Sequence, residues 1–332
     1  MIMKLYTITS SRHARRAFTL MELLICLVIM TILVFVVAQM MNVATAITRP
    51  AKKHIDTDTQ ARTILDRMAL DFAQMMIRTD IDYYVKGQAG FKKTNPHGKG
   101  VGNLQNGQHG NDQIAFFTQT SGYYPQTTNQ SPISLVAYRI NADNTSASYL
   151  QFQRMGKGLL WNAATKQNPQ QMVFLPLTIT GTWAAATDDS LTDTNYETTG
   201  PNVFRLEYYY LLKDGTVTDV PWITSTSTSL NGFADVEGIA MAIAVIDPAS
   251  RSMISQQQLF NLMSDLPDFE TAHGNGYGNP NKTISSLEGI WEGAVESDAA
   301  TGQAGGSPFP PPAAAAVRIY SRYFDLKTLA GF

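Results

Sequence analysis

Cysteine is almost absent from this chain of 332 residues, which contains only Cys26. A single thiol excludes an intramolecular disulfide framework and any zinc site built from several cysteines. The five histidines are spread along the sequence without metal-ligand spacing. Charge is also scarce, at 16% of residues, and 25 Lys and Arg against 27 Asp and Glu lack the basic excess of a dedicated nucleic-acid binder.

Motifs of the common catalytic classes are missing as well. The sequence has no Gly-x-Ser-x-Gly elbow, no His-Glu-x-x-His pair and no P-loop. The Gly-rich residues 97–110 are not followed by Gly-Lys-[Ser/Thr], so they favour a flexible loop over a phosphate site. We therefore expect no enzyme activity and no cofactor, although the dispersed carboxylates leave an acid–base pair open.

One acidic loop is a candidate metal site. Asp188, Asp189 and Asp193 lie in a segment rich in oxygen-bearing side chains, which Ca²⁺ prefers. The spacing lacks the EF-hand pattern and its final Glu, and these residue types are common in solvated turns. We expect no metal there, with Ca²⁺ as the alternative.

Long apolar runs are present at one place only, directly after a basic leader. Residues 1–17 contain Lys4, Arg12, Arg15 and Arg16 and no acid, and residues 23–48 contain no charge at all. About 20 apolar residues suffice to span a bilayer as a helix. Positive charge before the span predicts a cytoplasmic leader and an extracytoplasmic remainder. That remainder carries 21 Lys and Arg against 27 acids.

A cleaved secretory signal is the simplest alternative interpretation of this segment. Such signals have a shorter apolar core, of about 7–15 residues, followed by a small-x-small cleavage site. The apolar run here is longer, and Ala44 and Ala46 stand only at its end. Its length therefore favours a retained helix over simple secretion.

Glu22 is the feature that a plain membrane anchor does not explain. An isolated carboxylate in the membrane costs about 3 kcal/mol, unless it lies at the headgroups as an N-terminal helix charge. Its context, R-R-A-F-T-L-M-E-L-L, resembles the processing and methylation signal of type IV pilins and type II secretion pseudopilins. The resemblance implies cleavage by a prepilin peptidase between Ala17 and Phe18, and N-methylation of Phe18. The family usually has Gly where this chain has Ala17.

The resemblance also implies a role for Glu22 in assembly. In a filament of bundled apolar helices, its carboxylate would neutralise the terminal amine on Phe18 of a neighbouring subunit. Unpaired charges are costly in a low dielectric, so such a pair selects the correct axial register.

After the span the sequence predicts an amphipathic helix and then strands. Arg49-Pro50 interrupts the pattern, because proline removes a helical hydrogen bond. Helical periodicity then returns, and we expect a helix as far as residue 79. Its apolar stripe comprises Ala61, Ile64, Leu65, Met68, Phe72, Met75 and Met76. Charged residues, Asp71 included, lie largely off that stripe. Val, Ile, Tyr and Phe predict strands at 113–118, 133–140, 149–155, 203–212, 216–220, 236–246 and 317–324. A short helix is expected at 255–264. Residues 266–289 and 299–316 favour mobile surface or linker, with a partner-binding part of a tip protein as the equal alternative.

The expected organisation is therefore an α+β pilin-like protein. It comprises a cleaved leader at 1–17, a transmembrane and assembly helix at 18–48, an amphipathic continuation at 49–80, and a head at 81–332 whose mainly antiparallel sheet covers the stripe. The strand at 236–246, its Asp247-Pro248 turn and the closing V-R-I-Y-S-R-Y-F-D-L resemble J-type minor pseudopilins and Verru_Chthon cassette protein C. Processing would leave 315 residues, which is large for a densely packed major subunit.

We thus expect a minor subunit of a type IV pilus or type II secretion pseudopilus. Its partners would be the prepilin peptidase, other pilins or pseudopilins, and the inner-membrane assembly platform. The head would lie in the periplasm and then in the filament or at the cell surface.

Two alternatives remain open at the sequence level. A signal-anchored extracytoplasmic enzyme or binding protein would leave Glu22 incidental. A DNA-uptake pilin would need clustered basic residues, for which Lys92, Lys93 and Lys99 are the candidates, but the acidic remainder disfavours nucleic acid.

Overall fold

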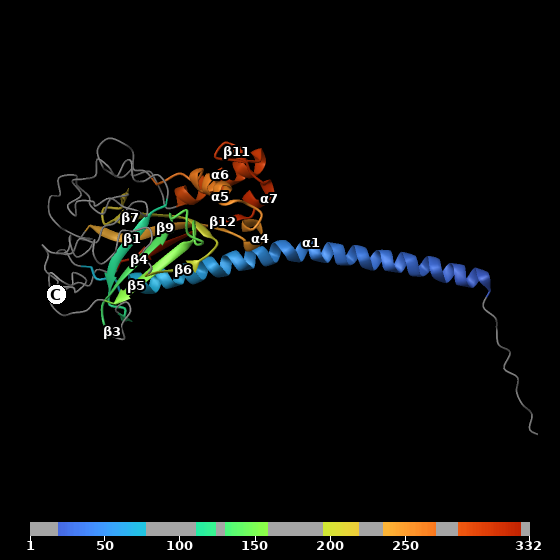
Figure 1. The fold of residues 1–332 in the computed structure, drawn as a ribbon, viewed down its shortest axis with the longest axis horizontal. Helices are drawn as coiled ribbons and strands as arrows, with labels where there is room; N and C mark the ends of the chain where they lie inside the picture. Colours follow the sequence, from blue (N-terminus) through green and yellow to red (C-terminus); the bar gives the residue numbers. More distant parts are fainter. Residues whose placement is uncertain are drawn as a thin grey trace, which may run out of the picture. The chain divides into compact units, whose positions relative to one another are not determined.

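The computed structural model describes residues 19–77, 111–123, 130–158, 195–218, 235–269 and 285–326. By the density of internal contacts the chain divides into two compact units, Met1–Lys52 and Lys53–Phe332. Figure 1 shows the order of the elements along the chain.

Helix α1 is a single α-helix of 54 residues, Leu20–Ala73. It continues through Arg49 and Pro50, where the sequence pattern is interrupted, into the predicted amphipathic continuation of the helix. Residues 19–43 are exposed on all sides in the single chain, as expected of a segment that is apolar all round. The first unit therefore has no core of its own within its described residues.

The helix ends six residues before the predicted end at residue 79. Beyond Ala73 the backbone turns onto the edge of strand β1, Gln113–Thr118. Met75 forms an isolated antiparallel bridge with Thr118, and the Met76 N–H donates to the Phe117 carbonyl at 2.9 Å. Pairing with a strand satisfies backbone groups that another helical turn would have satisfied, so the competing sheet edge ends the helix.

Two four-stranded sheets form the framework of the second unit, and their pairings are antiparallel throughout the described residues. The first sheet has the order β1-β4-β5-β6, with β4 at Ser134–Ile140, β5 at Phe152–Gly158 and β6 at Tyr196–Gly200. The second has the order β12-β9-β7-β8, with β12 at Val317–Asp325, β9 at Val236–Ile246, β7 at Val203–Leu212 and β8 at Val217–Thr218. The predicted α+β fold class is confirmed.

The apolar stripe of α1 forms the centre of the core, as predicted. Ala61, Ile64, Leu65, Met68 and Phe72 of α1 are buried; beyond the end of the helix, Met75 is buried and Met76 is partly buried. The Phe72 ring stacks on Phe116 of β1 with centroids 4.7 Å apart, and it lies 5.0 Å from Phe324 of β12. One aromatic side chain of the helix therefore contacts both sheets, and its burial removes a large apolar area from water.

Asp71 is a charged residue of α1 that is buried. Its side chain is buried and accepts hydrogen bonds from Nε and Nη2 of Arg154 on β5, at 2.8 and 3.1 Å. The Tyr138 hydroxyl on β4 donates to the same carboxylate. Burial and the nearby Asp71 charge raise the pKa of Tyr138 well above its ordinary value. The sequence predicted only that Asp71 lies off the apolar stripe; its burial depends on these partners, which are distant in sequence.

Short elements account for most of the strands that the sequence did not predict. They are β2 and β3, Gly122–Tyr123 and Gln130–Ser131, which pair with each other, and β6. β5 begins at Phe152 and not at residue 149, because Leu150 has a left-handed backbone with a φ of 54°. A residue in that conformation interrupts a strand.

A helical layer lies between β9 and β12 in the sequence, near the C-terminus (Figure 1). It comprises α4 at Pro248–Arg251, α5 at Gln256–Ser264, α6 at Ser285–Thr301, the hairpin of β10 at Gln303–Ala304 and β11 at Ser307–Pro308, and α7 at Pro311–Ala314. The prediction of α5 is confirmed, and a capping box between Ser255 and Gln258 begins it.

The C-terminal segment 299–316 is ordered, so the prediction of a mobile surface or linker was wrong there. Phe309, Ala313 and Ala314 are buried, and Trp291 of α6 is fully buried beside them in the same core. The prolines in this segment restrict its backbone, while the Phe and Ala side chains supply apolar surface. Of residues 266–289, those at 270–284 lie outside the described residues.

Candidate functional site

The first turn of α1 holds the one predicted site residue that the structure describes, Glu22. Its carboxylate Oε2 accepts hydrogen bonds from the Thr19 N–H at 2.9 Å and from the Thr19 hydroxyl at 3.0 Å. In return the Glu22 N–H donates to Thr19 Oγ1 at 3.3 Å. Thr19 precedes the first helical residue, Leu20, and Glu22 follows three positions later.

This reciprocal arrangement is a capping box. Two of the backbone N–H groups that the start of a helix leaves unpaired are satisfied by side chains. The negative charge of Glu22 also lies where the helix dipole favours an anion. In the single chain, Glu22 therefore has a local partner that compensates part of the cost of placing a carboxylate beside an apolar helix.

Sequence reasoning singled out Glu22 but missed Thr19 as its partner. The Thr-x-x-Glu spacing directly before an apolar run is the sequence signature of a capping box. That spacing was visible at Thr19 and Glu22, so the partner could have been found without a structure.

The helix beyond the cap is able to cross a membrane by length and composition. The candidate span is Leu20–Val43, 24 residues with no buried position. At 1.5 Å per residue it is about 36 Å long, more than the roughly 30 Å of a hydrocarbon core. Cys26 is exposed within this span. Its thiol there has the character of a small apolar side chain.

Several predicted residues fall outside the described part of the chain. They are Ala17 and Phe18 at the expected cleavage site, Asp188, Asp189 and Asp193 of the acidic loop, and the basic candidates Lys92, Lys93 and Lys99. Within the described ranges, no group of three or more His, Cys, Asp or Glu side chains could hold a metal ion.

The second half of α1 is tied to the head by polar contacts from β12. The Tyr320 hydroxyl donates to Asp58 and lies 3.2 Å from the Thr57 hydroxyl. Arg322 pairs with Asp66 farther along the helix. Burial and the hydrogen bond to Asp58 raise the pKa of Tyr320 to about 12, so its hydroxyl remains a donor at neutral pH. Asp58 and Asp66 of α1 thus contact β12 directly through polar side chains.

A buried charge cluster lies inside the head, on the strand β7. Arg205 is fully buried, pairs with Asp268, and lies 3.6 Å from the Glu207 carboxylate. Its guanidinium is 5.3 Å from the Trp291 ring, whose Nε1–H donates to the Pro267 carbonyl at 2.8 Å. These contacts hold the chain after α5 against the sheet, and we assign them a structural role.

Comparison with known families identifies the N-terminal segment. Residues 12–38 match a family model described as the prokaryotic N-terminal methylation motif. Neither the curated proteins nor the solved structures give a match to the chain. The matched residues contain the Ala17-Phe18 junction, Thr19, Glu22 and most of the apolar helix, and they support a type IV pilin-like protein that is processed at its N-terminus.

Proposed function

We propose that this chain is a minor subunit of a type IV pilus or a type II secretion pseudopilus. The match at residues 12–38 is the observation that carries the proposal. It coincides with a helix whose first turn is capped by Glu22 and whose next residues are apolar and exposed. We assign the chain a structural role and no catalytic one.

Processing comes first in the proposed route. A prepilin peptidase cleaves between Ala17 and Phe18 and N-methylates Phe18. Before cleavage the basic leader stays in the cytoplasm by the positive-inside rule, so the helix lies in the inner membrane and the head in the periplasm. The chain then enters a filament together with other pilins or pseudopilins, through the inner-membrane assembly platform.

Glu22 has a second task after processing. Cleavage creates a terminal amine on Phe18, and a neighbouring subunit brings its Glu22 carboxylate to that amine when the helices are in register. The attraction is strong in a low dielectric, and a mismatched register leaves both charges unpaired. The contact with Thr19 holds the carboxylate until that exchange.

Size and C-terminal sequence support a minor subunit. The processed chain of 315 residues is large for a subunit that must pack densely along a filament. The strand β9 and the closing strand β12 carry the resemblance to J-type minor pseudopilins and to Verru_Chthon cassette protein C. We place the chain among such minor proteins, with the superfamily as the broader assignment.

N-terminal peptide mass spectrometry of the membrane-extracted protein tests the processing step. With a prepilin peptidase present, the expected first residue is N-methylated Phe18; without it, residues 1–17 remain. Ala17→Leu should block cleavage by its bulk, and Ala17→Gly should permit it. If residues 1–17 are retained under both conditions, the proposal fails and a signal-anchored extracytoplasmic protein becomes the better interpretation.

The charge of Glu22 can be separated from its capping role. Glu22→Gln keeps a side chain that can cap the helix but has no charge, whereas Glu22→Ala loses both. Both variants should insert in the membrane at wild-type levels, and both should be absent from sheared filaments. If Glu22→Gln is incorporated normally while Glu22→Ala is not, Glu22 acts through the cap alone and the pairing with Phe18 is wrong.

A further inference from the structure

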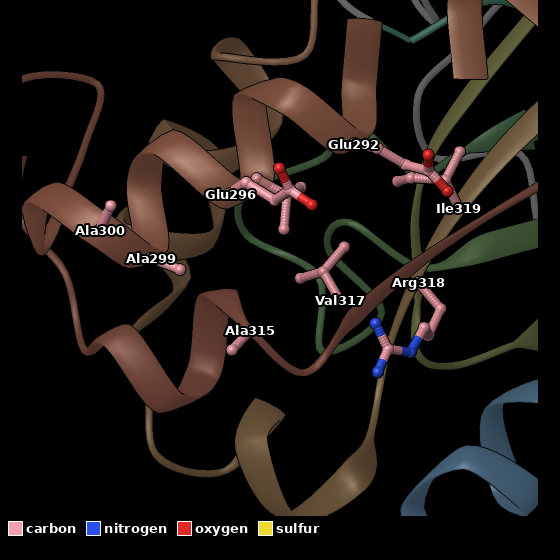
Figure 2. A pocket seen from close by; sticks show the side chains of 9 residues that line it. Glu292, Glu296, Ala299, Ala300, Ala315, Val317, Arg318 and Ile319 are labelled. Carbon is pink, nitrogen blue, oxygen red and sulfur yellow. The ribbon is translucent and has the colours of Figure 1, made fainter. Parts of the chain in front are cut away.

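A groove lies between α6 and the beginning of β12, on the side of the second sheet away from α1. Its volume is about 620 Å³, within the range of known binding sites. Glu292 and Glu296 of α6 form one wall, Val317 and Ile319 of β12 form the other, and Arg318 lies at its edge (Figure 2). Small side chains such as Ala299 and Ala315 close its end.

Beside this groove, the outer edge of β12 has backbone hydrogen-bonding groups with which no strand pairs within the described residues. Within the described residues β12 is the outer strand of its sheet. The Leu326 N–H donates to the Glu237 carbonyl, and in an antiparallel pair the residues that face the partner strand alternate. The even-numbered residues of β12 therefore face β9. The backbone groups of Val317, Ile319, Ser321 and Tyr323 point outward, where another strand could pair.

The α6 wall of the groove is negatively charged. Helix α6 has four acidic residues and no basic one. Two of them are not available to a ligand: Glu288 accepts a hydrogen bond from Ser321, and Asp298 is buried. Glu292 and Glu296 remain exposed, and their side chains extend toward β12 (Figure 2).

The spacing of these two carboxylates matches that of an extended chain. Residues four apart on a helix are separated by about 6 Å along its axis. Residues two apart on a strand, which lie on the same face, are separated by about 6.6 Å. The contact of Glu288 with Ser321 shows that α6 lies alongside β12, so an added strand would present every second side chain to the α6 wall.

We propose that this groove binds an extended segment of a partner protein with basic residues at alternate positions. The segment adds a strand to β12 and hydrogen bonds to the outward N–H and C=O groups of Val317, Ile319 and Ser321. Two Lys or Arg side chains pair with Glu292 and Glu296, and small apolar side chains fill the space beside Val317 and Ala315. Main-chain bonds supply affinity, and the two carboxylates supply specificity. The proposal is independent of how the N-terminus is processed.

The test uses the full chain in a neutral detergent and a rhodamine-labelled peptide of alternating Val and Lys. Fluorescence anisotropy should show binding that weakens at least tenfold in the double variant Glu292→Gln, Glu296→Gln. The control variant Glu197→Gln, Glu237→Gln removes two other exposed carboxylates and should bind as the wild type does. Equal affinity in both double variants would overturn the proposal.

Two further probes separate strand addition from simple charge attraction. The same peptide N-methylated at every second backbone nitrogen keeps its charge but cannot pair with β12, and it should not bind. A peptide of alternating Val and Glu should not bind either. Unchanged binding of the N-methylated peptide would refute strand addition. Self-association of the wild type that is lost in the Glu292→Gln, Glu296→Gln variant would identify a second copy as the occupant and would also refute the proposal.

Discussion

Arg154 on β5 bonds to both carboxylate oxygens of Asp71 on α1, 83 residues away in sequence. Asp71 is buried, whereas the Arg154 side chain is 16% exposed. This bidentate contact joins the first sheet to the long helix at a place where an unpaired carboxylate would be costly. Such geometry is the favourable case for a buried ion pair.

Removing Arg154 should therefore destabilise the head. Arg154→Met keeps much of the side-chain volume but leaves the Asp71 carboxylate buried with fewer hydrogen-bond donors. We expect the free energy of unfolding to fall by about 3 kcal/mol. Arg67 also approaches Asp71, at 3.3 Å, from an exposed position one turn earlier. Arg67→Met should cost under about 0.5 kcal/mol. Urea unfolding of the detergent-solubilised chain gives both values; equal effects would contradict this assignment.

Trp291 should be essential to the C-terminal helical layer. Its ring is fully buried and its indole N–H bonds to the Pro267 carbonyl. Trp291→Ala should lower the free energy of unfolding by about 3–5 kcal/mol because it leaves a large cavity. Ile290, the preceding residue, is 47% exposed, so Ile290→Ala should change stability by no more than about 0.5 kcal/mol. Thermal unfolding of the two variants measures the difference, and a Trp291→Ala variant as stable as Ile290→Ala would show that α6 is not part of the core.

Asp298 should make the stability of the head depend on pH. Burial and the nearby charge of Asp265 raise the pKa of Asp298 to about 6, and its Oδ2 has no hydrogen-bond partner within the described residues. The folded state therefore binds a proton more tightly than the unfolded state, whose Asp has its ordinary pKa. The stability that this proton contributes is present at low pH and is lost as the pH rises through about 6.

Asp298→Asn should remove that dependence. At pH 7.5 the variant should be more stable than the wild type by on the order of 1 kcal/mol, and the advantage should shrink as the pH falls below 6. Glu296→Gln changes an exposed carboxylate of the same helix and serves as the control. Denaturant midpoints of the variants and the wild type at pH 4.5, 6 and 7.5 measure this difference. If the stability of Asp298→Asn relative to the wild type grows toward low pH, the predicted direction of the pH dependence is wrong.

Thr19 should control the first turn of the helix. Thr19→Val removes the hydroxyl that accepts the Glu22 N–H, and loss of such a cap costs about 1 kcal/mol. The Glu22 amide should then exchange with deuterium about fivefold faster in detergent micelles. Thr31→Val removes a hydroxyl that bonds to the Val28 carbonyl in mid-helix and caps nothing. Exchange at Glu22 should not change in that variant, and an unchanged rate in Thr19→Val would contradict the capping role.

Local patterns in the sequence sufficed for much of the framework. The stripe from Ala61 to Met75 predicted the buried face of α1, because helical periodicity places those side chains together regardless of their partners. Strands β1, β7 and β9 have the predicted bounds, since each is rich in β-branched or aromatic residues. Glu22 and the apolar helix were also evident in the sequence, and the motif match covers both.

Other features depended on residues far apart in the chain. Asp71 looked like one more surface charge until Tyr138 and Arg154 were found beside it. Helix α6 carries buried Leu287, Trp291 and Val295 at intervals of four, but the glycines between them resemble a loop composition.

The sequence by itself determined the long apolar helix, the methylation motif and the periodic faces of helix and strand, because these depend on neighbours within a few residues. Only the tertiary structure decided where α1 ends, which charges are buried, and that Glu292 and Glu296 stand opposite β12, the outer strand of its sheet within the described residues. Burial and strand pairing depend on long-range contacts, and those contacts exist only once the chain has folded.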